Sequence, residues 1–228
     1  MIKAVVFDLD HTLFDRYETL KLVVPMLREK FSFNKDITDD YFCREICFAD
    51  KQYVHGGWDK ILEHLVKCNM FSVNPDIDEY TEVLLSCFKT VAVPYGFSLP
   101  MLKKLKEMGY KTGLITNGRH EIQSAKLKLL GLTESFDAVL ISGDYSFRKP
   151  DERIFKAAAE LLNVETSEMM YVGDHPKSDI EGSRNAGCVP VWVQTTGTWI
   201  FPEIEKPELK VKTVEEIPEI VERYNNGR

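Results

Sequence analysis

The chain has 228 residues, of which 44% are hydrophobic and 29% charged, and its formal net charge is −7. This length favours one core domain that carries an insertion, and the composition is typical of a soluble globular protein with a sizeable apolar core. The acidic balance argues against a protein that wraps nucleic acid, because such proteins need a surplus of basic residues.

The sequence shows no membrane segment and no disulfide pattern. The apolar run at residues 1–7 is too short for a signal peptide or a membrane span, and no later stretch approaches the required ~20 apolar residues. The five cysteines are odd in number and include no Cys-x-x-Cys pair. We therefore expect a protein of a reduced, cytoplasmic compartment, with no membrane and no nucleic acid among its partners.

Strands and helices are predicted to alternate along most of the chain. A first apolar strand at residues 2–7 is followed, after a long gap, by a regular series in which each helical pattern precedes an apolar run. Such a series predicts a parallel sheet covered by helices on both faces, and the continuously apolar strands fit burial on both sides. The predicted strands of the series are residues 112–115, 136–141, 169–172, 189–193 and 209–213, and the predicted helices are residues 99–108, 120–130, 151–162, 177–186 and 214–224.

The gap after the first strand contains only helical patterns. Its predicted helices cover residues 18–31, 38–50, 58–67 and 77–90, and no clear strand pattern interrupts them. The expected fold is therefore α/β, with a Rossmann-like three-layer core around a central parallel sheet and an all-helical insertion.

Polar residues follow four of the predicted strands. In a parallel sheet these positions meet at one edge, where ligands bind. The motifs that contain these polar residues are Asp8, Asp10 and Thr12 after the first strand, Thr116, Asn117 and Gly118 after the second, Lys149 and Pro150 after the third, and Asp174 with Asp179 after the fourth.

These residue types suit phosphoryl transfer. Asp8 and Asp10 are two positions apart in extended chain and can face one substrate, so that one carboxylate attacks phosphorus while the other protonates the leaving oxygen. Thr116 and the backbone N–H groups of Asn117 and Gly118 can bind phosphate oxygens, and Lys149 supplies a fixed positive charge.

The acidic residues also predict a metal ion. Asp8, Asp10, Asp174 and Asp179 would repel one another and an anionic phosphate in one pocket. A hard divalent cation relieves that repulsion, and Mg²⁺ suits a site of carboxylates, phosphate and water.

In order and spacing, the four motifs resemble those of the haloacid dehalogenase superfamily. The run from Gln123 through Lys126, Leu127, Leu130, Gly131, Leu132 and Phe136 to Asp137 resembles its small-molecule phosphatases of the acylneuraminate-9-phosphate phosphatase and nucleotidase-like kind. The resemblance implies a catalytic core at residues 1–15 and 95–228 and a mobile helical cap at residues 16–94 that selects the substrate.

The same resemblance implies residue roles. Asp8 forms an aspartyl-phosphate, Asp10 acts as general acid and base, and Thr116 and Lys149 hold the phosphoryl group. The implied Mg²⁺ ligands are the Asp8 carboxylate, the Asp10 backbone carbonyl and Asp174, with Asp179 at the metal or one shell out. The expected enzyme is a phosphoric monoester hydrolase of a small phosphorylated metabolite (a sugar phosphate or nucleotide), acting as a monomer or homodimer.

Several alternatives stay open at the level of sequence. A phosphomutase keeps every motif, and only the cap separates it from a phosphatase. A 2-haloacid dehalogenase is disfavoured because Asp10 is present, and a non-catalytic binding protein because no motif has decayed. A phosphonate hydrolase would need a cap lysine such as Lys51 or Lys60, but nothing singles out either one.

The cap itself offers weaker candidates. Arg16, Tyr17, Lys51 and the loop at residues 53–58 could contact a leaving group, but a plain interhelical turn with Trp58 in the cap core is the preferred interpretation. Asp179 could also be an ordinary acidic residue in the first turn of a helix.

Overall fold

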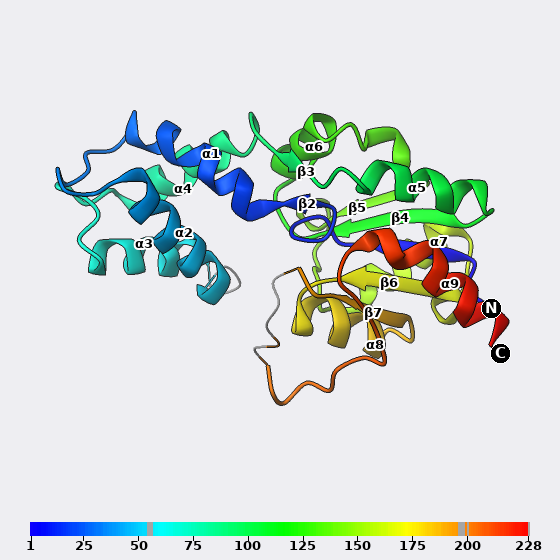
Figure 1. Cartoon of the computed structure of the whole chain (residues 1–228). Coiled ribbons are helices and arrows are strands. Elements are labelled where there is room, and N and C mark those ends of the chain that lie inside the picture. Colours follow the sequence, from blue (N-terminus) through cyan, green and yellow to red (C-terminus); the bar gives the residue numbers. More distant parts are fainter. Residues whose placement is uncertain (54–56, 196–198, 200, 228) are drawn as a thin grey trace. The chain divides into compact units, whose positions relative to one another are not determined.

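The computed structural model describes residues 1–53, 57–195, 199 and 201–227 (Figure 1). The chain divides into two compact units, one formed by Met1–Asp15 with Pro94–Arg228 and the other by Arg16–Val93. Within the described residues, no helix is both long and apolar enough to cross a bilayer.

The first unit is built on a parallel sheet of six described strands in the order β5-β4-β1-β6-β7-β8. This arrangement confirms the predicted α/β fold. The strands are β1 (Ala4–Phe7), β4 (Lys111–Thr116), β5 (Ala138–Ile141), β6 (Met169–Gly173), β7 (Val189–Val193) and β8 (Leu209–Val211).

Strand β1 lies in the middle of the sheet. All four of its residues are fully buried, as expected for an apolar strand covered on both faces. Phe7, its last residue, is in register with Leu114 of β4 and Val172 of β6. From β1 the chain continues to β4 on one side, while β6 lies on the other, so β1 ends where the strand order reverses. Such a switch point is where open α/β sheets bind ligands.

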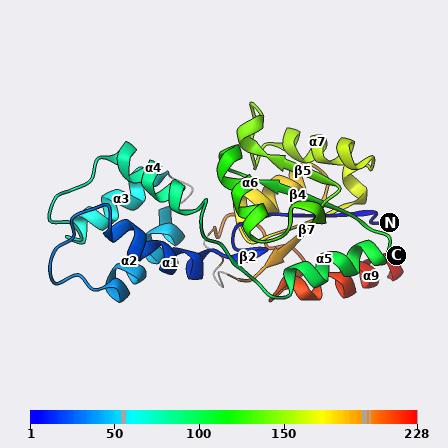
Figure 2. The same cartoon turned by 90° about the horizontal axis from the view of Figure 1, so that it is seen from above.

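Helices cover both faces of the sheet. Helices α5 and α9 pack against each other on one face, and α7 lies on the other (Figure 2). Helix α7 also packs with α8. Helix α7 buries an apolar stripe that includes Phe155 and Leu162, and Asp151 caps its first turn by accepting the Arg153 N–H. The helices of this unit are α5 (Ser98–Glu107), α6 (His120–Leu129), α7 (Glu152–Leu162), α8 (Gly182–Asn185) and α9 (Ile217–Asn226).

One predicted helix differs in kind from the expectation. The helix predicted at residues 177–186 starts as a π-helical turn, Pro176–Glu181, before α8 begins. The Ile180 N–H donates to the His175 carbonyl at 3.3 Å, and the His175 ring accepts the N–H groups of Lys177 and Ser178. A π-turn of this kind is uncommon and often occurs at functional sites.

The second unit is helical. Tyr80, Phe42, Leu20 and Leu65, one from each of its four described helices, are fully buried in its core. An isolated antiparallel bridge joins Phe33 and Phe71. The helices of this unit are α1 (Arg16–Arg28), α2 (Asp39–Tyr53), α3 (Trp58–Lys67) and α4 (Ile77–Cys87). At the boundaries of the two units along the chain, the short strands β2 (Phe14–Asp15) and β3 (Val93–Pro94) pair with each other, and they were not predicted.

Candidate active site

Asp8 is the first residue after the central strand. Its backbone N–H donates to the Val172 carbonyl at 2.9 Å, which extends the pairing of β1 with β6 and fixes the backbone from which the side chain projects. The carboxyl is buried, and Lys149 Nζ donates to its Oδ1 at 2.6 Å. Burial is the main cause that raises the pKa of Asp8 to about 7; Lys149 opposes this rise, and the nearby Asp179 and Asp10 add to it.

Lys149 is the charged centre of the site. Its buried ammonium donates to Asp8, to Asp179 Oδ1 at 2.7 Å and to the Tyr171 hydroxyl at 2.9 Å. Burial alone would lower the pKa of Lys149, but Asp179 and Asp8 together raise it well above its ordinary value. A permanent positive charge therefore lies beside Asp8.

Asn117 holds the backbone of Lys149 in place. Its side-chain amide donates to the Lys149 carbonyl and its side-chain oxygen accepts the Lys149 N–H, both at 3.0 Å. The peptide bond from Lys149 to Pro150 is cis. Asn117 was predicted to offer its backbone N–H to phosphate, whereas the structure shows that its side chain holds the backbone of Lys149.

Asp179 is not an ordinary helix acid. It is buried in the π-turn, with one carboxylate oxygen on Lys149 and the other accepting the His175 N–H at 2.9 Å. Burial would raise the pKa of Asp179, but Lys149 outweighs it, so the pKa is lowered. The Asp179 carboxyl therefore stays ionised.

Asp174 completes an acidic cluster with Asp8 and Asp179. One carboxylate oxygen from each residue lies within 4.8 Å of the others. Burial, followed by the charges of Asp179 and Asp8, raises the pKa of Asp174 well above its ordinary value. Three buried carboxyls beside one ammonium form a set of hard oxygen donors with surplus negative charge, which fits Mg²⁺.

Asp10 points its carboxylate to a different set of partners. Lys126 Nζ lies 2.8 Å and 3.1 Å from its two oxygens, and the Gln123 side-chain amide donates to Oδ2 at 3.0 Å. Among the described residues, Asp10 is not part of the acidic side-chain cluster of Asp8, Asp174 and Asp179.

Thr116 and Gly118 have partners within the protein. The Thr116 hydroxyl accepts a short hydrogen bond from Gln123, and the Gly118 N–H, which was expected to face a phosphate, donates to Ser142 Oγ at 3.0 Å. Gly118 has a φ of 151°, and a Cβ there would lie 3.0 Å from the Gln123 side chain. In this structure the Gly118 N–H therefore supports the loop.

Three side chains around the site were not predicted from sequence. Lys126 and Gln123 are three positions apart on α6, so their side chains lie on the same helix face. This spacing was the sequence pattern from which their common position could have been predicted, but they were used only as part of the resemblance to small-molecule phosphatases. Tyr171 lies within an apolar strand and was read as core. Its hydroxyl accepts from Lys149 and donates to the Ile115 carbonyl at 3.2 Å.

Arg16, one of the weaker cap candidates, has partners within the helical unit. Arg16 is buried within the helical unit, where it pairs with Asp50 through two hydrogen bonds and lies over the Trp58 and Phe88 rings. It is thus a structural residue of that unit. Residues 54–56, which include the candidates His55 and Gly56, lie outside the described residues.

Comparison with known proteins decides the family. The model of the family described as "haloacid dehalogenase-like hydrolase" matches residues 5–193, which is most of the chain. The chain belongs to this family. The sequence-based assignment to the haloacid dehalogenase superfamily, and to its hydrolases, is therefore confirmed.

Two relatives of the chain are phosphatases by name. The chain is 31% identical to a glyceraldehyde 3-phosphate phosphatase of Methanopyrus kandleri, over 85% of this chain and 84% of the relative. It is 24% identical to N-acylneuraminate-9-phosphatase of Mus musculus, over 97% and 94% of the two chains.

Solved structures agree with the fold. A HAD phosphatase from Thermococcus onnurineus is 29% identical with a TM-score of 0.65, and the match covers 96% of this chain and 98% of that one. An L-2-haloacid dehalogenase from Xanthobacter autotrophicus has a TM-score of 0.71 at 21% identity, with 97% and 99% covered. The latter likeness concerns the fold alone.

Proposed function

We propose that this haloacid dehalogenase-like hydrolase is a Mg²⁺-dependent phosphatase that acts on a small phosphorylated metabolite through an aspartyl-phosphate on Asp8. The observation that carries the proposal is the buried Lys149 ammonium, which lies 2.6 Å from Asp8 and 2.7 Å from Asp179. It places the proposed nucleophile beside a fixed cation and an acidic metal-type cluster.

In this mechanism, an oxygen of Asp8 forms a bond to phosphorus while the ester P–O bond breaks. Asp10 gives a proton to the departing oxygen and then takes one from the water that attacks the acyl phosphate, which releases inorganic phosphate and restores Asp8. Lys149 stabilises negative charge on the phosphoryl oxygens, and Thr116 is proposed to bind them as well.

Asp8, Asp174 and the Asp10 carbonyl would hold Mg²⁺, with Asp179 beside them. The ion would supply positive charge that lets an anionic nucleophile approach an anionic ester. The Asp179 carboxylate already accepts hydrogen bonds from Lys149 and the His175 N–H. We therefore propose that Asp179 orients these groups rather than binding the metal directly.

The helical unit at residues 16–94 is proposed to be the cap that selects the substrate. The relatives point to phosphorylated trioses, acyl sugars and nucleotides as classes to test, since their names include phosphatases of glyceraldehyde 3-phosphate and N-acylneuraminate 9-phosphate and a pyrimidine 5′-nucleotidase.

The decisive variant is Asp8→Asn. It keeps the shape of the side chain but removes the nucleophile, so we expect hydrolysis of p-nitrophenyl phosphate to fall by more than roughly 10³-fold. Asp36→Asn, an exposed change in the helical unit, is the matched control and should retain activity. Retained activity in Asp8→Asn with an intact fold would sink the mechanism.

Two further measurements complete the test. EDTA should abolish turnover and Mg²⁺ should restore it, and insensitivity to EDTA would remove the metal from the proposal. A screen of phosphate esters that follows both free phosphate and rearranged ester separates the alternatives: isomerised product without free phosphate would indicate a phosphomutase.

A further inference from the structure

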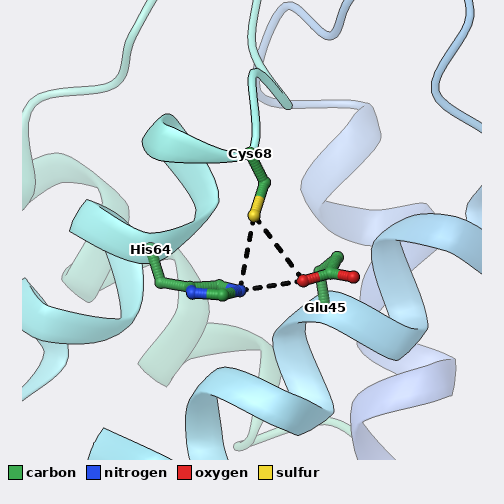
Figure 3. Close-up of side chains that lie close together, drawn as sticks. All are labelled: Glu45, His64 and Cys68. Carbon is green, nitrogen blue, oxygen red and sulfur yellow. Dashed lines mark hydrogen bonds and ion pairs between the residues drawn. The ribbon is translucent and has the colours of Figure 1, made fainter.

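A second cluster of ligating side chains lies within the helical unit, outside the acidic site. Glu45 projects from α2 and His64 from α3, and Cys68 is the C-cap residue that directly follows α3 (Figure 3). His64 Nε2 lies 2.8 Å from Glu45 Oε2 and 3.5 Å from Cys68 Sγ, and Sγ lies 3.6 Å from the same glutamate oxygen. The three side chains converge on one point between the two helices.

We propose that Glu45, His64 and Cys68 form a binding site for a divalent cation of the Zn²⁺ class. Tetrahedral coordination with ordinary Zn–S, Zn–N and Zn–O bond lengths requires separations of about 3.6 Å from sulfur to nitrogen, about 3.6 Å from sulfur to oxygen and about 3.4 Å from nitrogen to oxygen. The first two separations agree with the observed 3.5 Å and 3.6 Å. The third, 2.8 Å, has to open by about 0.6 Å to reach the required separation, which rotation of the glutamate side chain can provide.

The donor types select the metal. A thiolate and an imidazole favour Zn²⁺ over Mg²⁺, which prefers oxygen donors. Binding would release the thiol proton of Cys68, so a carboxylate and a thiolate around a divalent ion would leave the site with no net charge. His64 and Cys68 are four positions apart on one helix face, and Glu45 reaches them from the neighbouring helix.

Access to the site is open. The side chains of His64 and Glu45 are 17% and 24% exposed, and Cys68 is also partly exposed, so an ion can enter and water can take the fourth position. Three protein ligands with one open position is the coordination found in zinc sites that keep an exchangeable ligand. The filled site would cross-link α2 to α3.

The His64–Glu45 hydrogen bond is the competing structure, because it satisfies both side chains without a metal. The two cases differ in Cys68. A hydrogen-bonded pair of helices needs no thiol at that position, whereas a Zn²⁺ site depends on it. The experiment is therefore built on Cys68→Ser, with Cys43→Ser on α2 as the matched control, since Cys43 is a partly exposed cysteine outside the cluster.

The full chain, stripped of metal, would be titrated with Zn²⁺ and separately with Co²⁺ in excess Mg²⁺, which keeps the acidic site supplied. We expect one tight equivalent in the wild type and in Cys43→Ser, with a Co²⁺ spectrum that shows tetrahedral bands and thiolate charge transfer. Cys68→Ser should lose the charge-transfer band and weaken binding by more than the roughly 10–100-fold that follows loss of an outer-shell partner.

His64→Gln provides an independent variant if Cys68→Ser fails to fold, and circular dichroism reports folding in each case. Zn²⁺ should also raise the melting temperature of the wild type but not that of either ligand variant. Equal Zn²⁺ affinity in wild type and both variants, or a Co²⁺ complex without a thiolate band, would overturn the proposal. Neither result depends on phosphatase activity, so the test is separate from that of the proposed function.

Discussion

At the scale of single residues, Asp10 is defined by what helix α6 places against it. Lys126 is buried, pairs with both oxygens of Asp10 and lies 5.2 Å from the centre of the Phe14 ring. Gln123 links Asp10 to Thr116. The proposed acid and base is thus held by its own cation, separate from the lysine beside Asp8.

Lys126→Met tests this arrangement. Methionine fits the apolar surroundings but removes the charge, so we expect kcat/KM to fall by about 10²-fold through misplacement of Asp10. A carboxylate without its cation holds its proton more tightly, so any limb of the pH–rate profile that Asp10 sets should move to higher pH. Lys128→Met, an exposed change on the same helix, is the control. An unchanged profile and rate would contradict the positioning role.

The residues on strand ends could be predicted, but their partners could not. Asp8 and Lys149 were identified because parallel strands deliver their carboxyl ends to one edge. Tyr171 could not be found in this way, since its ring belongs to the apolar core and only the hydroxyl reaches the site. The hydrogen bond from the Gly118 N–H to Ser142 Oγ could not be predicted either, because no sequence pattern indicates how these two loops approach each other.

At the scale of elements, period and burial predicted the type of almost every strand and helix. The exceptions are the unpredicted short strands β2 and β3 and the segment from residue 176. In that segment, Pro176 lies in the first turn of a π-helix, and the His175 ring accepts two of its backbone N–H groups. Phe48 of α2 is half exposed although it is a large apolar residue, and the centre of its ring lies 5.2 Å from that of His64.

Gly173 at the end of β6 is required by the π-turn. A Cβ at this position would lie 2.6 Å from Cβ, Cγ and Oδ2 of Asp179, whose carboxylate is fixed by Lys149 and His175. We expect Gly173→Ala to cost about 1–3 kcal/mol in unfolding free energy and about 10²-fold in kcat/KM. Gly96→Ala, where the added methyl meets nothing within 4 Å, is the control in urea unfolding and activity assays.

Asp137 makes stability depend on pH. Partial burial would raise its pKa, but the Thr112 N–H at 2.7 Å and the Lys106 ammonium outweigh burial and lower it. A carboxyl whose pKa is lower in the folded than in the unfolded state stabilises the folded protein at pH values above its unfolded pKa, which is near 4. This stabilisation is lost as the pH falls through the pKa of the folded state. The Asp137 side chain is 43% exposed, so solvent screens these interactions, and Asp137→Asn should therefore cost at most about 1 kcal/mol at pH 7 and progressively less below about pH 4. Urea unfolding of the wild type and of Asp137→Asn, at pH 7 and at a pH below about 4, measures this difference in unfolding free energy. An equal loss of unfolding free energy at both pH values would contradict the prediction.

At the scale of the whole molecule, the division into two compact units allows one unit to lose stability without the other. The helical unit depends on the buried pair of Arg16 and Asp50, whose side chains are 7% and 1% exposed. Asp50→Asn removes the carboxylate charge that pairs with the buried Arg16 guanidinium, and we expect a loss of about 3–5 kcal/mol in unfolding free energy. Hydrogen exchange should quicken across residues 16–93 and much less in the sheet.

The double variant Arg16→Met with Asp50→Leu is the matched control, because removal of both charges avoids the uncompensated one and should lie closer to the wild type. Faster exchange spread evenly over the sheet strands and the helical unit would show that the two units unfold together.

The central place of β1 in the sheet has a consequence for synthesis on the ribosome. Phe7 must wait for Leu114 and Val172, so more than a hundred residues are translated before its first neighbouring strand exists. At about 5–20 residues per second, the nascent strand is unpaired for roughly 5–20 s. During that interval the contiguous helical unit can fold first, while β1, an entirely apolar strand, is exposed to chaperones and to self-association.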